Sequence, residues 1–211
     1  MGAFRFCQGD ILPVMEINRQ YASKNFWRGN DPRSIMLHTT GGGSLIGAIE
    51  TLKARGLSYN YIFCEGKVYE LVHYKNSAWH AGVVKGMNMR SQIFYKTGKG
   101  EDNPNRHSIG FSFVYPKPDY KVLNDVDVDN AVLLMKQIGK ETNQRFNADN
   151  IFYHREVTND KPIIVQGYRN QILEALIGDK DDKDVVDEKY LKLMIQFLQL
   201  RIQLLLLQLK Q

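Results

Sequence analysis

The hydrophobic pattern predicts short strands separated by turn residues and helices. Five segments have the length, apolar content or alternation expected of strands: residues 33–38, 59–64, 67–73, 108–115 and 151–154. The fourth alternates, so that its odd-numbered apolar side chains share one face. The second and third flank Glu65-Gly66, a turn signal, and so predict a hairpin. The first and the last each end in a histidine, His38 or His154.

Helical spacing of apolar residues appears between and after these strands. The first predicted helix has Ser44 as its expected N-cap and ends at Gly56. Two further helices are predicted over residues 127–142 and 167–177. Strands and helices in this order indicate an α/β domain with a central mixed β-sheet flanked by helices.

A charged segment without apolar residues divides the chain. We assign residues 1–32 to an N-terminal arm, 33–177 to the α/β domain, 178–186 to a charged linker and 187–211 to a C-terminal amphipathic helix. That helix carries two adjacent apolar stripes, which is more apolar surface than a solvated helix exposes. We expect it to associate with copies of itself or with a protein partner, and docking on its own domain is the alternative. Its glutamines argue against a membrane span.

Composition and charge describe a soluble globular protein. The 211 residues are 43% hydrophobic and 24% charged, with a net charge of +5. A mildly basic surface suits an anionic polymer without selecting one. We expect no nucleic-acid partner and no membrane span. Cys7 and Cys64 are expected to be free thiols, and the N-terminus lacks the apolar run of a signal peptide.

His38 and His154 are the residues that indicate chemistry. Each closes a short apolar strand, so both side chains could face the same edge of the sheet. Neutral imidazoles on rigid strands are good ligands of Zn²⁺, and a catalytic zinc has three protein ligands and one open position. A packed or capping histidine is the alternative for either residue alone, and the pair favours a metal site.

Five segments, in order along the chain, resemble one enzyme family. They are Leu37-His38-Thr39-Thr40-Gly41-Gly42, the hairpin from Ser58 to Leu71, Ala78-Trp79-His80-Ala81-Gly82, Asn105-Arg106-His107-Ser108-Ile109-Gly110-Phe111 and Tyr153-His154-Arg155-Glu156-Val157. These segments resemble the type 2 N-acetylmuramoyl-L-alanine amidases, whose fold is shared by phage lysozyme-type amidases and the peptidoglycan recognition proteins. The resemblance covers about residues 33–177 and implies a Zn²⁺-dependent hydrolase acting on peptidoglycan.

The resemblance also implies roles for individual residues. His38 and His154 would be zinc ligands, and Tyr59 and Lys161 would be catalytic groups that stabilise the oxyanion. The peptidoglycan or muropeptide substrate would bind at Trp79, His80 and Asn105. The alternatives are a core aromatic for Tyr59 and a histidine bonded within a turn for His80.

The third zinc ligand departs from the family's pattern. The family continues from its second histidine to a lysine and, two residues later, to a cysteine or aspartate. Here Lys161 can stand for the lysine, but Ile163 occupies the ligand position. Asp160 is the carboxylate in this loop and is the candidate third ligand. The alternative is that Asp160 lies in a solvated turn and that the third ligand is lost.

Two functions remain open at this point. The first is a zinc amidase that hydrolyses the amide between N-acetylmuramic acid and the L-alanine of the stem peptide. Such an enzyme would be endolysin-like, made in the cytoplasm without a signal peptide, and would reach the wall after release or on a bacteriophage particle. The second is a catalytically degenerate module that binds peptidoglycan fragments without cleaving them.

Overall fold

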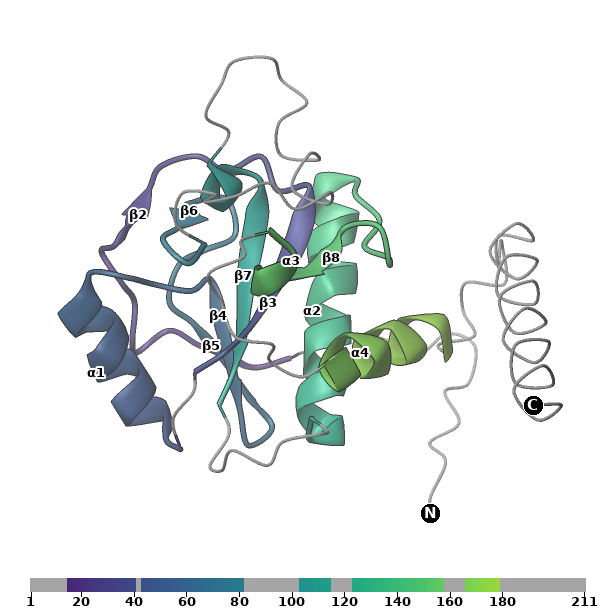
Figure 1. The fold of residues 1–211 in the computed structure, drawn as a ribbon, viewed down its shortest axis with the longest axis horizontal. Coiled ribbons are helices and arrows are strands. Elements are labelled where there is room, and N and C mark those ends of the chain that lie inside the picture. Colours follow the sequence, from purple (N-terminus) through teal and green to yellow (C-terminus); the bar gives the residue numbers. More distant parts are fainter. Residues whose placement is uncertain (1–14, 41–42, 82–102, 115–122, 158–165, 179–211) are drawn as a thin grey trace, which may run out of the picture. The chain divides into compact units, whose positions relative to one another are not determined.

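The computed structural model describes residues 15–40, 43–81, 103–114, 123–157 and 166–178 (Figure 1). The chain falls into two compact units, residues 1–173 and 174–211. The first unit contains the β-sheet, and the described part of the second is the end of the last helix. Asp160, Lys161 and the expected association helix at 187–211 lie outside the described residues.

Short strands and four α-helices make up the described secondary structure. The strands are β1 (Ile17–Asn18), β2 (Phe26–Trp27), β3 (Ser34–Thr39), β4 (Tyr61–Cys64), β5 (Lys67–Glu70), β6 (Ser77–Ala78), β7 (Ser108–Phe113) and β8 (Ile151–Tyr153). The helices are α1 (Leu45–Arg55), α2 (Asp125–Thr142), α3 (His154–Val157) and α4 (Gln166–Gly178), with a 3₁₀ turn, η2, at Pro104–Arg106.

The main sheet is mixed and has six strands in the order β1-β5-β4-β7-β3-β8. Only β4 and β5 pair in antiparallel fashion, and the other neighbours are parallel. Strands β2 and β6 form a separate antiparallel pair. This arrangement confirms the predicted fold class, a central mixed sheet with flanking helices. Strand β3 lies between β7 and β8, so the residue at its end has parallel neighbours on both sides.

The β4–β5 hairpin turns at Glu65 and Gly66, as the sequence predicts. Both residues have positive φ, 52° and 75°, which suits the tight turns that match the right-handed twist of paired strands. The Gly66 N–H donates to Asp127 Oδ1 at 2.8 Å. This bond ties the hairpin to the first turn of α2.

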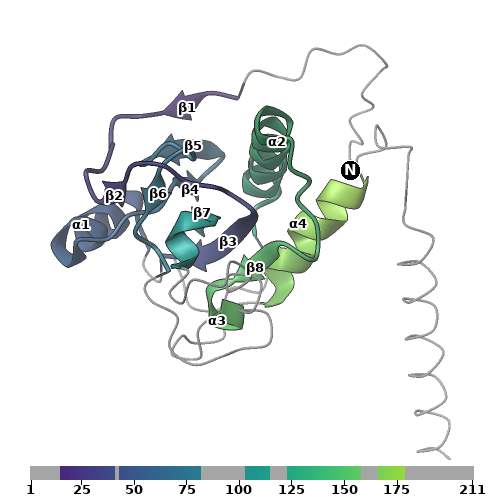
Figure 2. The same ribbon diagram turned by 90° about the horizontal axis from the view of Figure 1, so that it is seen from above.

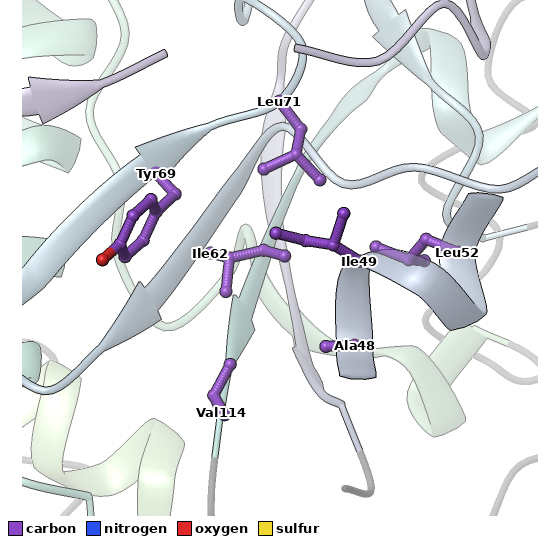
Figure 3. Close-up of a cluster of buried hydrophobic side chains, with 7 residues drawn as sticks. All are labelled: Ala48, Ile49, Leu52, Ile62, Tyr69, Leu71 and Val114. Atoms are coloured by element: carbon purple, nitrogen blue, oxygen red, sulfur yellow. The ribbon is translucent and has the colours of Figure 1, made fainter. Parts of the chain in front are cut away.

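Helices α1 and α2 lie on opposite faces of the sheet (Figures 1 and 2). On one face, side chains of α1 pack against strands β4, β5 and β7 and the loop after β5 (Figure 3), in a cluster of Ala48, Ile49, Leu52, Ile62, Tyr69, Leu71 and Val114. Helix α2 contacts β4 and β5 on the other face. Burial of this apolar surface on both sides is the main force that holds the sheet.

The ends of α1 lie where the sequence places them. The Ser44 hydroxyl accepts a hydrogen bond from the Gly47 N–H at 3.1 Å, and Gly56 is left-handed with φ 64°. Helix α2 begins at Asp125, two residues earlier than predicted, because the Asn124 side chain accepts from the Val126 N–H and caps it there.

Residues assigned to the N-terminal arm contribute two short strands, β1 and β2. Strand β1 pairs with β5 and forms one edge of the main sheet, and β2 pairs with β6. Within the described ranges, no helix has the length and apolar character needed to cross a bilayer.

Candidate active site

His38 is the centre of a cluster of rings at the carboxyl ends of β3 and β8. Its ring centroid lies 4.8 Å from that of Tyr59, 5.0 Å from that of His80 and 4.7 Å from that of His154. His38 occupies the second-last position of β3 and is 8% exposed. In open α/β sheets, the carboxyl ends of parallel strands are where ligands bind.

His154 reaches the same place from the neighbouring strand. Leu37 of β3 pairs in register with Tyr153 of β8, so the next residues, His38 and His154, lie side by side. His154 is the first residue of α3 and is partly buried. Its Nε2 lies 3.0 Å from the carbonyl oxygen of Ala81. The structure therefore brings together the two histidines that the sequence singles out.

His80 lies beneath His38, and its ring is almost completely buried. His80 Nδ1 is 3.0 Å from His38 Nε2, and His80 Nε2 is 3.4 Å from Ser108 Oγ. Burial, with His154 nearby, lowers the pKa of His80 to about 3, and the Ser108 backbone opposes this shift. The ring is therefore neutral at physiological pH. The sequence places His80 on the wall of a substrate cleft, whereas the structure shows a 6% exposed side chain bonded to His38.

Asn105 holds the turn that carries His80. Its Oδ1 accepts hydrogen bonds from the backbone N–H groups of His80 at 3.0 Å and of Ala81 at 2.7 Å. Asn105 is 2% exposed, so its side chain is engaged within the fold. The structure places this expected substrate-binding residue below the surface, where it fixes the position of the turn.

Trp79 belongs to an aromatic surface beside the cluster. Its ring lies 5.4 Å from that of Trp27, and the Arg106 guanidinium lies over the Trp27 ring at 5.4 Å. Trp79 is partly buried and Trp27 is 36% exposed. Aromatic rings with a neighbouring cation can contact both apolar and anionic parts of a ligand.

Tyr59 precedes β4 and faces His38. Burial raises the pKa of its phenol, and the Ser112 hydroxyl and the Arg55 charge only partly offset this effect. The phenol therefore remains protonated at neutral pH and can donate a hydrogen bond.

The face of β7 that carries Ser108, Gly110 and Ser112 lies against the ring cluster and forms the floor of the site. The sequence does not predict this. All six residues of β7 are buried, although only the odd-numbered ones are large and apolar. Ser108, Gly110 and Ser112 occupy the other face. Ser112 pairs in register with His38, and its hydroxyl lies at the Tyr59 phenol, whose pKa it lowers. The signal that could identify this face is a run of small residues at alternate positions of a strand.

Gly110 leaves just enough room for the His80 ring. A Cβ at this position would lie 2.7 Å from His80 Cγ and 2.8 Å from Cδ2, closer than atoms can pack. We expect Gly110→Ala to lower the free energy of unfolding by about 1–3 kcal/mol, the usual cost of overpacking. Urea unfolding measures this change.

Ser112→Ala is the matched control on the same face of β7. It removes one hydroxyl beside Tyr59 and crowds no neighbour, so stability should change by about 1 kcal/mol or less, the net contribution of a single hydrogen bond. Equal stabilities of Gly110→Ala and the wild type would mean that the His80 ring has more freedom than this packing allows.

The cluster offers nitrogen ligands for a metal ion. The described residues contain no group of three or more His, Cys, Asp or Glu side chains that could hold one. His38 and His154 are two adjacent imidazoles of the kind that zinc prefers. The candidate third ligand, Asp160, lies outside the described residues. The described donor set thus fits two of the three protein ligands of a catalytic zinc.

Comparison with protein families identifies the fold and the class of the chain. The model of the N-acetylmuramoyl-L-alanine amidase family (Amidase_2) matches residues 28–163, which include the whole ring cluster. The chain belongs to this family, as its motifs predict. A comparison with curated proteins gives no match.

Solved structures share the fold at low sequence identity. N-acetylmuramoyl-L-alanine amidase LysC from Clostridium intestinale URNW superposes with a TM-score of 0.55 at 14% identity, covering 77% of this chain and 97% of that chain. The endolysine amidase LysCS from the same organism gives 0.55 at 16% identity, over 81% and 99%. A selenomethionine AmpD derivative gives 0.55 at 17% identity, over 75% and 93%.

Proposed function

We propose that this chain is a zinc-dependent peptidoglycan amidase that hydrolyses the amide between N-acetylmuramic acid and the L-alanine of the stem peptide. The observation that carries the proposal is the meeting of His38, His154 and Tyr59 at the carboxyl ends of β3 and β8, within a chain of the amidase family. The two imidazoles supply two of the three protein ligands of a catalytic zinc, and a protonated phenol can stabilise an oxyanion.

His38, His154 and Asp160 are the residues that would hold zinc. Bound there, zinc would supply Lewis acidity to the scissile carbonyl and lower the pKa of a water molecule. The histidines lie on rigid strand ends, which limits the reorganisation needed on binding. Their neighbours His80 and Ala81 keep the rings in place.

Tyr59 and Lys161 would act on the reacting carbonyl oxygen. The Tyr59 phenol, kept protonated by its raised pKa, donates a hydrogen bond to the negative charge that develops there. The Lys161 ammonium would place a positive charge beside the same oxygen and stabilise it. Trp79 with Trp27 and Arg106 offers apolar surface and a cation to the sugar and the anionic stem peptide.

Metal removal and restoration test this function directly. The full-length chain is incubated with purified peptidoglycan, and release of new L-alanine amino groups is measured before chelation, after chelation and after Zn²⁺ is added back. We expect loss of release on chelation and recovery with roughly one equivalent of Zn²⁺ per chain. A protein that binds wall polymer, contains no zinc and releases no amino groups would instead be a degenerate binding module.

A further inference from the structure

We infer that His80 is a positioning residue that fixes which nitrogen of His38 can bind a metal. A chain of hydrogen bonds runs from the Pro104 carbonyl through Ser108 and His80 to His38. It places the ring proton of His38 on Nε2, so that Nδ1 is the nitrogen with the lone pair. The inference rests on the proposed function only in naming a metal as the ligand of Nδ1.

The series of hydrogen bonds begins at the Pro104 carbonyl, which can act only as an acceptor. Ser108 Oγ lies 2.6 Å from the Pro104 carbonyl oxygen, which can only accept. The hydroxyl proton of Ser108 is therefore directed at Pro104. Toward His80 Nε2, 3.4 Å away, the same oxygen can only accept, so His80 carries its proton on Nε2.

Whether His38 donates or accepts in its hydrogen bond with His80 follows from the tautomer of His80. The His80 ring is buried, and with its proton on Nε2 its lone pair lies on Nδ1. That nitrogen lies 3.0 Å from His38 Nε2, and a hydrogen bond between two nitrogens needs one donor. His38 must therefore donate from Nε2, which leaves Nδ1 as its acceptor nitrogen.

The tautomer of His154 is fixed in the same way, by a different acceptor. Its Nε2 lies 3.0 Å from the Ala81 carbonyl oxygen, so it donates there, and its lone pair is also on Nδ1. Asn105 binds the backbone N–H groups of both His80 and Ala81. One side chain thus positions the two acceptors that set the tautomers of His38 and His154.

This arrangement is typical of residues that support a metal site. Histidine ligands commonly donate their second ring N–H to a carbonyl or another acceptor, which fixes the tautomer and the ring orientation. Gly110 leaves the space that the His80 ring occupies, because any side chain there would strike the ring. His80 itself uses both of its nitrogens within the fold, which favours a positioning role over direct contact with substrate.

Multiple-bond ¹H–¹⁵N NMR of the full-length, chelator-treated wild-type chain tests the tautomers without any substitution. We expect His38, His80 and His154 to carry their ring protons on Nε2. A proton on Nδ1 of His38 would overturn the inference. This measurement does not depend on activity, so it remains decisive even if the chain proves to bind no metal, an outcome that would contradict the proposed function instead.

Two substitutions of His80 test its effect on metal binding. The His80→Gln side chain can accept from His38 through its amide oxygen and donate to Ser108 through its amide nitrogen, whereas His80→Leu can do neither. We expect the affinity for Co²⁺, followed by its visible absorption, to fall about 10–100-fold in His80→Leu and to be largely restored in His80→Gln. His73→Leu is the control, because His73 lies outside the ring cluster, and its affinity should match the wild type.

Circular dichroism establishes that each variant is folded before its affinity is compared. A folded His80→Leu variant that binds Co²⁺ as tightly as the wild type would overturn the inference. A His80→Gln variant as weak as His80→Leu would also contradict it, because the loss would then not follow from the hydrogen-bonding pattern.

Discussion

His38→Ala is expected to lower kcat/KM for release of L-alanine amino groups from peptidoglycan by at least about 100-fold, since substitutions of groups that merely support a metal ligand already cost about 10–100-fold. The substitution removes the imidazole at the centre of the ring cluster, which contacts Tyr59, His80 and His154. Zinc content of the purified variant should fall together with the rate. Initial rates at several substrate concentrations, with zinc measured on the same samples, check both expectations.

His73→Ala is the control for removal of a histidine. His73 is partly buried in a turn, where its Nδ1 accepts from the Lys75 N–H and its ring lies against Tyr74, away from His38. The rate and the zinc content of the His73→Ala variant should equal those of the wild type. A His38→Ala variant that keeps full activity would rule out a catalytic centre at this cluster. A wild-type chain that binds wall polymer without cleaving it, together with a His38→Ala variant that binds with unchanged affinity, would favour the degenerate module.

The features that the sequence predicts well are those set by neighbours in the chain. The hairpin turn at Glu65-Gly66 follows from a residue pair that tolerates positive φ, and the ends of α1 follow from Ser44 and Gly56. His38 and His154 share a sheet edge because parallel strands that each end in histidine must bring those ends together. Local rules suffice for the turn and the helix ends, and the parallel pairing of β3 with β8 then brings the two histidines together.

The supporting residues act through contacts between distant segments, and no local pattern predicts this supporting role. The His80 ring meets His38, which lies 42 positions away, and Ser108, which lies 28 positions away. Asn105 holds the backbone of the 80–81 turn from a separate segment. Small residues such as Gly110 carry little hydropathy signal, so the alternation of β7 predicts its apolar face and leaves its other face unassigned. Only the folded arrangement shows that this face is the floor of the site.

Asn60→Ala is expected to lower the free energy of unfolding by about 3–5 kcal/mol, because each buried polar group that loses its partner costs about 1–3 kcal/mol. Asn60 has no exposed surface. Its Oδ1 accepts from the Gly110 N–H at 2.9 Å, and its Nδ2 donates to the carbonyls of Val72 at 3.2 Å and Asn76 at 3.1 Å. The side chain thus joins β7, at the glycine beneath His80, to the loop that follows β5. Urea unfolding followed by tryptophan fluorescence measures the change.

Asn18→Ala separates this effect from the general cost of losing an asparagine. The Asn18 side chain accepts a single bond from the Gln20 N–H at an exposed position, so its loss should cost no more than about 0.5 kcal/mol. Because Asn60 holds Gly110 in place, its removal should also loosen the packing around His80 and reduce activity in the fraction that remains folded. If Asn60→Ala unfolds at the same urea concentration as Asn18→Ala, water has replaced the amide at all three partners, and the link between the loop and β7 does not determine the stability of the site.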